Sequence, residues 1–98
     1  MPDYVRVATF EADEAAIDAM VKEIGSAEGP PPEIPGKRIT VLKDREGGRV
    51  SVAVRFGSEE DLLKGDAAFN AMSPSDDMGS MRRVSVDLLE VVLEREAP

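Results

Sequence analysis

The chain has 98 residues, the size of one domain, and its 42% hydrophobic and 33% charged residues are typical of a folded protein rather than a disordered one. The 20 acidic residues outnumber the 12 basic ones and give a net charge of −8, which argues against nucleic acid and anionic membrane surfaces as partners. No apolar run approaches the roughly 20 residues that span a bilayer.

Cysteine, histidine and tryptophan are absent from the sequence. Their absence excludes thiol nucleophiles, serine–histidine–aspartate triads and zinc sites of the usual kind, so we expect no metal and no cofactor. The first residues lack the basic and apolar regions of a signal peptide, and a cysteine-free chain fits a reducing compartment. We therefore expect a cytoplasmic location.

The first quarter of the chain predicts a strand followed by a helix. Alternation over Tyr4–Phe10 predicts the strand, with Val5, Val7 and Thr9 on one face and Tyr4, Arg6, Ala8 and Phe10 on the other. The helix is predicted over Glu14–Ile24, with Asp13 as its N-cap and Gly25 as its stop. Its buried stripe follows helical spacing and comprises Ile17, Met20, Val21 and Ile24.

A proline-rich segment, residues 28–36, then predicts an extended connection, for which a structural role is favoured over a proline-ligand role. Two further alternating runs, Lys37–Lys43 and Arg49–Phe56, predict a hairpin around the glycine-bearing turn at 44–48. The residues expected to meet the helices are Ile39 and Val41 in the first strand and Val50, Val52, Val54 and Phe56 in the second.

A second helix is predicted over Ser58–Met72, beginning at a Ser58 cap, with Gly65 allowing close packing on the sheet or a nearby ligand. The final run, Arg82–Glu94, predicts a long strand whose apolar residues change phase near Leu88 and Leu89. Either a β-bulge there returns both sets to one face, or the second half is buried on both faces against another chain. Because a long overhanging edge is adhesive, we expect a homodimer in which this segment crosses the subunit boundary.

The order of these elements is βαββαβ, which predicts an α+β, ferredoxin-like domain over residues 1–98. Its antiparallel four-stranded sheet has the order 4-1-3-2 and carries both helices on one face. The other face is left for water or a partner.

With this order, the long terminal strand and the run from Ser58 to Pro74 (SEEDLLKGDAAFNAMSP), the chain resembles the dimeric α/β-barrel superfamily, most closely its antibiotic-biosynthesis-monooxygenase-like proteins. The resemblance implies two sheets facing each other in a dimeric barrel, with a ligand pocket between each sheet and its helices. Members include cofactor-independent oxygenases of polycyclic phenols, haem-degrading enzymes, lactone isomerases and proteins without demonstrated activity. This chain departs from the catalytic members because it lacks a histidine for haem and the tryptophan of some oxygenase sites.

Without these two residue types, the resemblance still implies an apolar pocket that contains a side-chain amide, and Asn70 is the candidate for that amide. Alternatively, Asn70 serves as a helix C-terminal residue. We expect the ligand-binding residues to be Phe10, Phe56, Phe69, Asn70 and Met72. A cavity lined by these apolar residues would indicate ligand binding, whereas their mutual packing would indicate a structural dimer. The acidic clusters at 59–61 and 76–77 are interpreted as capping and solvated charge.

Arg6, Arg55 and Asp87 fall on neighbouring strands and are predicted to share the face away from the helices. There they would form a network at the dimer interface, or alternatively an anion-binding site. The sequence thus predicts a homodimer with an apolar pocket for a small apolar or phenolic ligand, either a monooxygenase-like enzyme or a non-catalytic binding or structural module. It assigns no catalytic residue.

Overall fold

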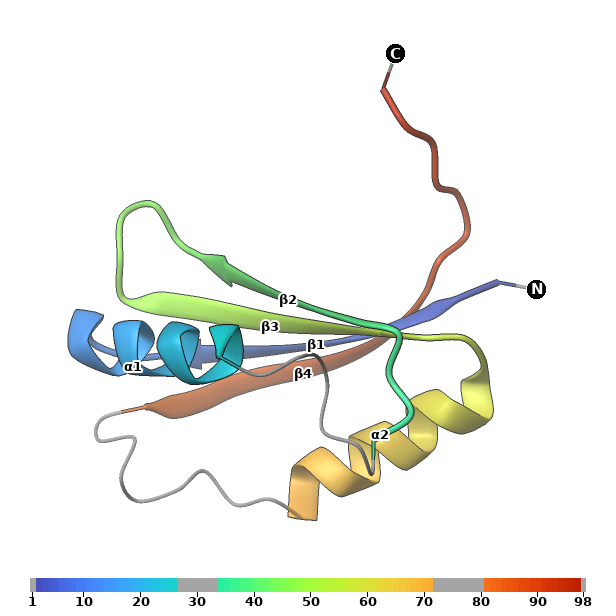
Figure 1. Ribbon diagram of the computed structural model, residues 1–98, viewed down its shortest axis with the longest axis horizontal. Helices are drawn as coiled ribbons and strands as arrows, with labels where there is room; N and C mark the ends of the chain where they lie inside the picture. Colours follow the sequence, from blue (N-terminus) through green and yellow to red (C-terminus); the bar gives the residue numbers. More distant parts are fainter. Residues whose placement is uncertain (1, 27–33, 72–80, 98) are drawn as a thin grey trace.

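The computed structural model describes residues 2–26, 34–71 and 81–97, and these form one sheet with two helices (Figure 1). The sheet order is β2-β3-β1-β4 with every neighbouring pair antiparallel, which confirms the predicted ferredoxin-like arrangement. The elements, in chain order, are β1 (Tyr4–Glu11), α1 (Glu14–Gly25), β2 (Arg38–Lys43), β3 (Arg49–Phe56), α2 (Glu59–Ala71) and β4 (Arg82–Glu90). None of the described helices is long and apolar enough to cross a membrane.

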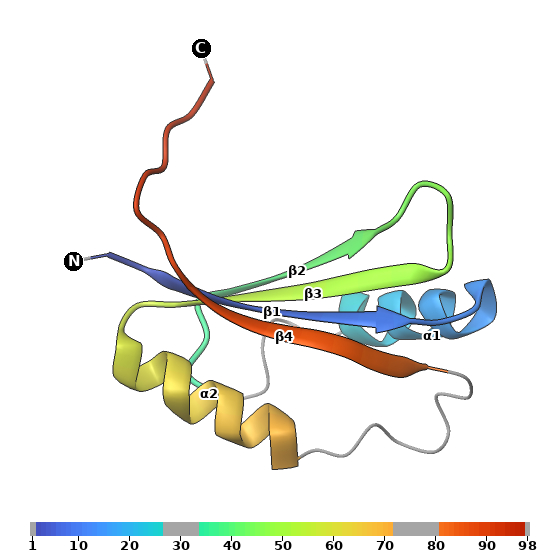
Figure 2. The same ribbon diagram turned by 180° about the vertical axis from the view of Figure 1, so that it is seen from behind.

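Strand register divides the sheet into a helix face, which α1 and α2 cover, and an open face. Arg6 lies opposite Val54 and Phe10 lies opposite Val50, so these residues belong to the helix face. The open face is formed by the alternate residues of the four strands, among them Val5, Val7, Arg38, Arg55, Asp87 and Leu89. Figures 1 and 2 show α1 near the β2–β3 hairpin and α2 toward the opposite end of the sheet.

Each helix closes its own part of the core. Under α1, Ile17 and Met20 pack with Val50, and Phe10 adds to this cluster. Under α2, Phe56 packs with Leu62, and Phe69 adds to this second cluster. The second cluster also contains Ile34, Val54, Tyr4, Ile39, Val52 and Ala68, and Val52 touches both clusters.

The predicted helix starts and the predicted close packing of α2 are confirmed. The Ala16 N–H donates to Asp13 Oδ1 (2.8 Å) at the start of α1, and the Asp61 N–H donates to Ser58 Oγ (3.1 Å) at the start of α2. At Gly65, a Cβ atom would collide with the ring of Phe56. Glycine therefore lets the α2 backbone rest directly on that ring.

The last strand differs from the prediction in two ways. Pairing between β1 and β4 is regular around Leu88 and Leu89, and the irregularity lies instead at Val84, because Thr9 pairs with Ser85 and Phe10 pairs with Arg83. Leu88 consequently lies on the helix face and Leu89 on the open face. Of the two alternatives for the change of phase, the bulge at these two leucines is thus wrong, and burial against another chain stays a prediction.

The strand also ends at Glu90 and not at Glu94. The reason is its partner: the Val91 N–H donates to the Asp3 carbonyl (2.8 Å), just before β1 begins at Tyr4. Beyond Val91, β1 has no further residues with which β4 could pair. Residues 91–97, called here the C-terminal tail, leave the sheet and project from it (Figure 1).

Candidate functional site

A buried arginine lies between the sheet and α2. Arg6 comes from the middle of β1, and its side chain is only 5% exposed. Its Nε donates to Asp66 Oδ1 (2.9 Å), its Nη2 donates to Asn70 Oδ1 (3.3 Å), and its guanidinium carbon lies 4.8 Å from the centre of the Phe69 ring. The same Asn70 oxygen accepts a bond from Arg83 Nη1 (2.7 Å) on β4. These five residues are called the Arg6 cluster.

Helical spacing explains why α2 can supply three members of this cluster. Asp66 and Asn70 are four residues apart, so they lie on the same side of the helix, and Phe69 lies beside them. The position below them on β1 is Arg6, which finds a carboxylate, an amide oxygen and an aromatic face within reach. A charge that would be costly to bury alone is thereby paired.

The Arg6 cluster carries more positive than negative charge. Both guanidinium groups, of Arg6 and Arg83, donate to the amide oxygen of Asn70, and the cluster holds one carboxylate, that of Asp66, which pairs with Arg6. Nη1 of Arg6 has no hydrogen-bond partner in the described part of the chain, although every fully buried side-chain nitrogen and oxygen there has one. This nitrogen is therefore not completely enclosed by the described residues, and its guanidinium group lies beside an aromatic ring.

The prediction that Arg6, Arg55 and Asp87 share the open face is wrong for Arg6. Arg55 lies opposite Val5, and Asp87 lies opposite Val7, so those two do belong to the open face. Arg6 is in the other phase of β1 and points toward α2. The more apolar phase of β1, with Val5 and Val7, is the one that faces away from the helices.

The described residues that were predicted to bind a ligand lie in two places, Phe56, Phe69 and Asn70 on the α2 side and Phe10 under α1. Phe69 and Asn70 belong to the Arg6 cluster. Phe56 is fully buried in the core under α2, and Phe10 packs in the other cluster, under α1. Met72 lies outside the described residues. Among the described members, therefore, Phe69 and Asn70 are the two that meet a charged donor.

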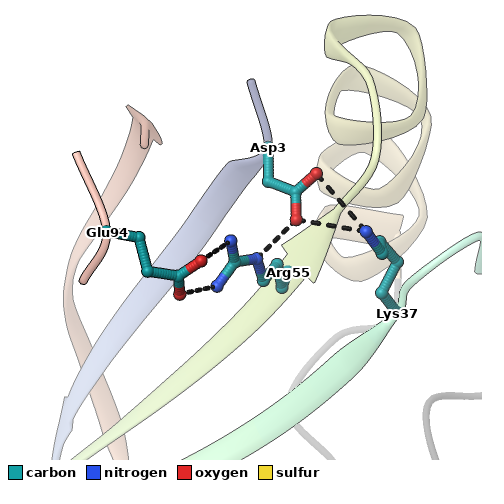
Figure 3. Close-up of polar contacts among 4 residues, drawn as sticks. All are labelled: Asp3, Lys37, Arg55 and Glu94. Carbon is teal, nitrogen blue, oxygen red and sulfur yellow. Dashed lines mark hydrogen bonds and ion pairs between the residues drawn. The ribbon is translucent and has the colours of Figure 1, made fainter. Parts of the chain in front are cut away.

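A second polar group, called here the Arg55 cluster, lies where the open face meets the C-terminal tail (Figure 3). Arg55 Nε donates to Asp3 Oδ2 (2.6 Å), while Nη1 and Nη2 donate to the two carboxylate oxygens of Glu94 (2.5 and 2.8 Å). Lys37 Nζ also donates to Asp3 Oδ2 (3.2 Å). Bidentate pairing of this kind is the strongest geometry available to a guanidinium.

This pairing changes the pKa of each carboxyl group. Hydrogen bonds from Arg55 and then Lys37 hold the pKa of Asp3 below its usual 3.8. The bidentate contact with Arg55 likewise holds the pKa of Glu94 below its usual 4.5, and Arg38 adds a weaker attraction. Both carboxylates are therefore ionised throughout the neutral range.

Sequence reasoning missed Asp66 and Arg83 in one cluster and Asp3, Lys37 and Glu94 in the other. The spacing from Asp66 to Asn70 was a usable signal, whereas the contacts of Arg83 and Glu94 depend on tertiary structure. Asp87 is exposed on the open face, and no ion pair joins it to another described residue. In the described ranges no group of three or more acidic residues is arranged to hold a metal ion.

Neither a family model nor a curated protein matches this sequence. Among solved structures, it is similar to the crystal structure of a protein described as a "putative antibiotic biosynthesis monooxygenase" from Bacillus cereus, with a TM-score of 0.60 and 23% identity over 99% of this chain and 100% of that one. It is also similar to Rv0793 from Mycobacterium tuberculosis, with a TM-score of 0.53 and 16% identity over 98% and 99% of the two chains. The predicted resemblance to antibiotic-biosynthesis-monooxygenase-like proteins is thus confirmed at the level of the fold.

Proposed function

We propose that the chain is a homodimer in which the Arg6 cluster binds a small organic anion, a phenolate or an enolate, between the sheet and α2. The observation that carries this proposal is the buried guanidinium of Arg6, which has one donor unused by described residues and lies over an aromatic ring. An oxyanion that accepts from Arg6 Nη1 would also approach Arg83, the second cation of the cluster.

The surroundings favour an aromatic or conjugated anion over a simple inorganic one. Phe69 supplies an apolar surface beside the charge, and desolvation by α2 strengthens the attraction between guanidinium and oxyanion. A nearby fixed cation stabilises the ionised form of a bound phenol and so lowers the pKa of that phenol. The site would thus raise the fraction of ligand present as phenolate.

That effect is what oxygenation without a cofactor requires of a protein. The electrons for oxygen come from the ionised substrate itself. One oxygen atom enters the reacting carbon, converting a CH₂ group to a carbonyl, and the other oxygen atom leaves as water. The chain then needs only to bind, ionise and shield the substrate. The likeness in fold to the Bacillus cereus protein supports this reaction class as a candidate.

A non-catalytic ligand-binding module is the second candidate, and one observation favours it. Asp66, the carboxylate of the cluster, is already paired with Arg6 at 2.9 Å. Oδ1 of this carboxylate is occupied by the Nε–H of Arg6, so Asp66 serves to pair the buried charge and is not a free base directed at a ligand. Binding and ionisation of a ligand need no such base, whereas turnover of a substrate that ionises poorly would.

The dimer is supported by exposed apolar residues on and after β4. This strand is at the edge of the sheet, and Leu88 and Leu89, one on each face, are 42% and 49% exposed. On the C-terminal tail, Val92 and Leu93 are 87% and 75% exposed. Apolar side chains concentrated along an open strand edge favour association with a second copy of the chain.

The binding test is a titration with naphthol, whose absorption changes on ionisation, compared across three arginine variants. Arg83→Met removes one cation without disturbing the core, and we expect it to weaken binding roughly tenfold, the usual value of a charged hydrogen bond. Arg6→Met is expected to abolish both binding and the lowered pKa of the naphthol. Arg49→Met is the matched control, because Arg49 is an exposed arginine of β3, opposite Glu11 on the open face.

Equal affinities in the wild type and all three variants would refute the assignment of the site. Oxygen consumption with anthrones then separates the two candidates. Turnover that Arg83→Met slows indicates an oxygenase, whereas binding of an anthrone without oxygen uptake indicates the binding module.

A further inference from the structure

Two arginines face each other directly on the open face. Arg38 of β2 and Arg55 of β3 are cross-strand partners, so their side chains leave the same face of the sheet side by side. Like charges in this position destabilise a sheet unless an anion lies between them. Lys37, next to Arg38, adds a third cation at the same end.

Two carboxylates neutralise this group, and they are held very differently. Asp3 is 16% exposed, directly precedes β1 and is shared between Arg55 and Lys37, so it is part of the body of the domain. Glu94 is 61% exposed and comes from the C-terminal tail, which has no regular secondary structure. Figure 3 shows it approaching Arg55 from the side opposite Lys37.

Lifting Glu94 away would leave a marked excess of positive charge. Lys37, Arg38 and Arg55 would then face the single carboxylate of Asp3, in a chain whose net charge is −8. The tail's other two charges, Arg95 and Glu96, cancel each other. The cations and Asp3, together with Glu94, Arg95 and Glu96 of the tail, line an open surface depression.

We propose that the Arg38–Arg55 pair is a carboxylate-binding site that Glu94 occupies in cis and from which a small organic di-acid displaces it. The Glu94 contact is bidentate, but it is solvent-exposed and made by a single carboxylate, so a ligand that brings two carboxylates can compete with it. One carboxylate takes the bidentate position on Arg55, and the second lies toward Arg38 and Lys37. Displacement frees the C-terminal tail beyond Val91, so ligand binding is coupled to release of this segment.

This site is independent of the Arg6 cluster, because the two lie on opposite faces of the sheet. Malonate is a suitable probe, followed through the Nε–H resonance of the Arg55 side chain by nuclear magnetic resonance at constant ionic strength. We expect malonate to shift this resonance in the wild type and to bind roughly two- to fivefold more tightly to Glu94→Gln, which removes the competing charge. Arg38→Gln should weaken binding in either background.

The matched control is Glu60→Gln, since Glu60 is an exposed glutamate that pairs with Lys64 on α2, away from this depression. It should bind malonate as the wild type does. The amide signals of Val92 and Leu93 report the tail, and they should sharpen as malonate saturates the wild type. Absence of any shift at Arg55, or equal affinity in Glu94→Gln and the wild type, would overturn the proposal.

A final arm distinguishes the source of the competing carboxylate. If Glu94 acts within its own chain, the apparent affinity for malonate is the same at low and high protein concentration. An affinity that falls as the protein is concentrated would mean that Glu94 of a second copy fills the site. That result would refute the proposal that Glu94 occupies the site within its own chain.

Discussion

Replacement of Gly65 by alanine tests the packing that places α2, and with it the Arg6 cluster, on the sheet. An alanine Cβ at this position would overlap the ring of Phe56 and would lie 3.5 Å from Cγ2 of Ile34. Phe56 is fully buried, so its ring cannot rotate into solvent to make room. The helix must therefore move away from the sheet, or the core must rearrange.

Two opposing effects set the size of the change. Overpacking a closed core costs about 1–3 kcal/mol, and an overlap with an immobile ring belongs in the upper half of that range. Alanine in place of glycine inside a helix returns about 1 kcal/mol. The net expectation for Gly65→Ala is a loss of about 1–2 kcal/mol in the free energy of unfolding. For a domain of this size, each kilocalorie lowers the Tm by about 4–8 °C.

The assay is urea unfolding with the slope m compared between variants, so that a change of midpoint reports stability alone. Gly25→Ala is the control, because nothing lies within 4 Å of a Cβ built there, at the last residue of α1. That variant should be unchanged or up to about 1 kcal/mol more stable. If Gly65→Ala also proved neutral or stabilising, the argument that glycine permits direct contact of α2 with Phe56 would be refuted.

Three other expectations follow from particular contacts. Arg6→Met should lower the free energy of unfolding by about 1–3 kcal/mol because Asp66 loses its partner, and adding Asp66→Asn should restore part of the loss in the same urea assay. Asp3→Asn should flatten the acid limb of a stability–pH curve. The folded-state pKa of Asp3 is depressed, so its stabilisation is complete above the usual value of 3.8 and is lost as the pH falls through the lower folded value. Ser58→Ala should cost about 0.5–2 kcal/mol by removing the cap of α2, whereas Ser58→Asp, which keeps a capping oxygen, should not.

Much of the fold was predictable because local patterns were unambiguous. Apolar and other residues alternate strictly over Arg49–Phe56, which predicts a strand with one buried face. The structure has β3 with these bounds. The caps at Asp13 and Ser58 and the glycine-bearing turn placed the element boundaries. Element order then determined the antiparallel sheet with little freedom.

The candidate site was harder to predict, because it depends on which face each strand presents. In β1, Val5 and Val7 form the more apolar phase, yet Arg6 is the residue that faces α2. The buried charge of Arg6 is tolerated because Arg6 donates hydrogen bonds to Asp66 and Asn70 on α2. A hydrophobicity pattern along β1 does not reveal these partners. Ile34 was missed for a similar reason, since it is a single apolar residue after the proline-rich stretch and yet packs in the core under α2.

The length of β4 illustrates a limit of pattern-based prediction. Apolar residues continue to Leu93, but a strand persists only while a neighbour offers hydrogen-bonding groups. The last acceptor next to β1 is the Asp3 carbonyl, which binds the Val91 N–H. The apolar sequence pattern therefore extends beyond Glu90, where the hydrogen-bonded pairing of β4 with β1 ends.

Native mass spectrometry of the gently purified protein, with and without added naphthol, tests the central proposal most directly because it reports assembly and ligand together. The proposal predicts twice the mass of one chain, and a non-covalent adduct with naphthol that Arg83→Met weakens and Arg49→Met does not. A species with the mass of one chain would contradict the dimer. A dimer that takes up naphthol equally in both variants, or not at all, would contradict the Arg6 cluster as the binding site.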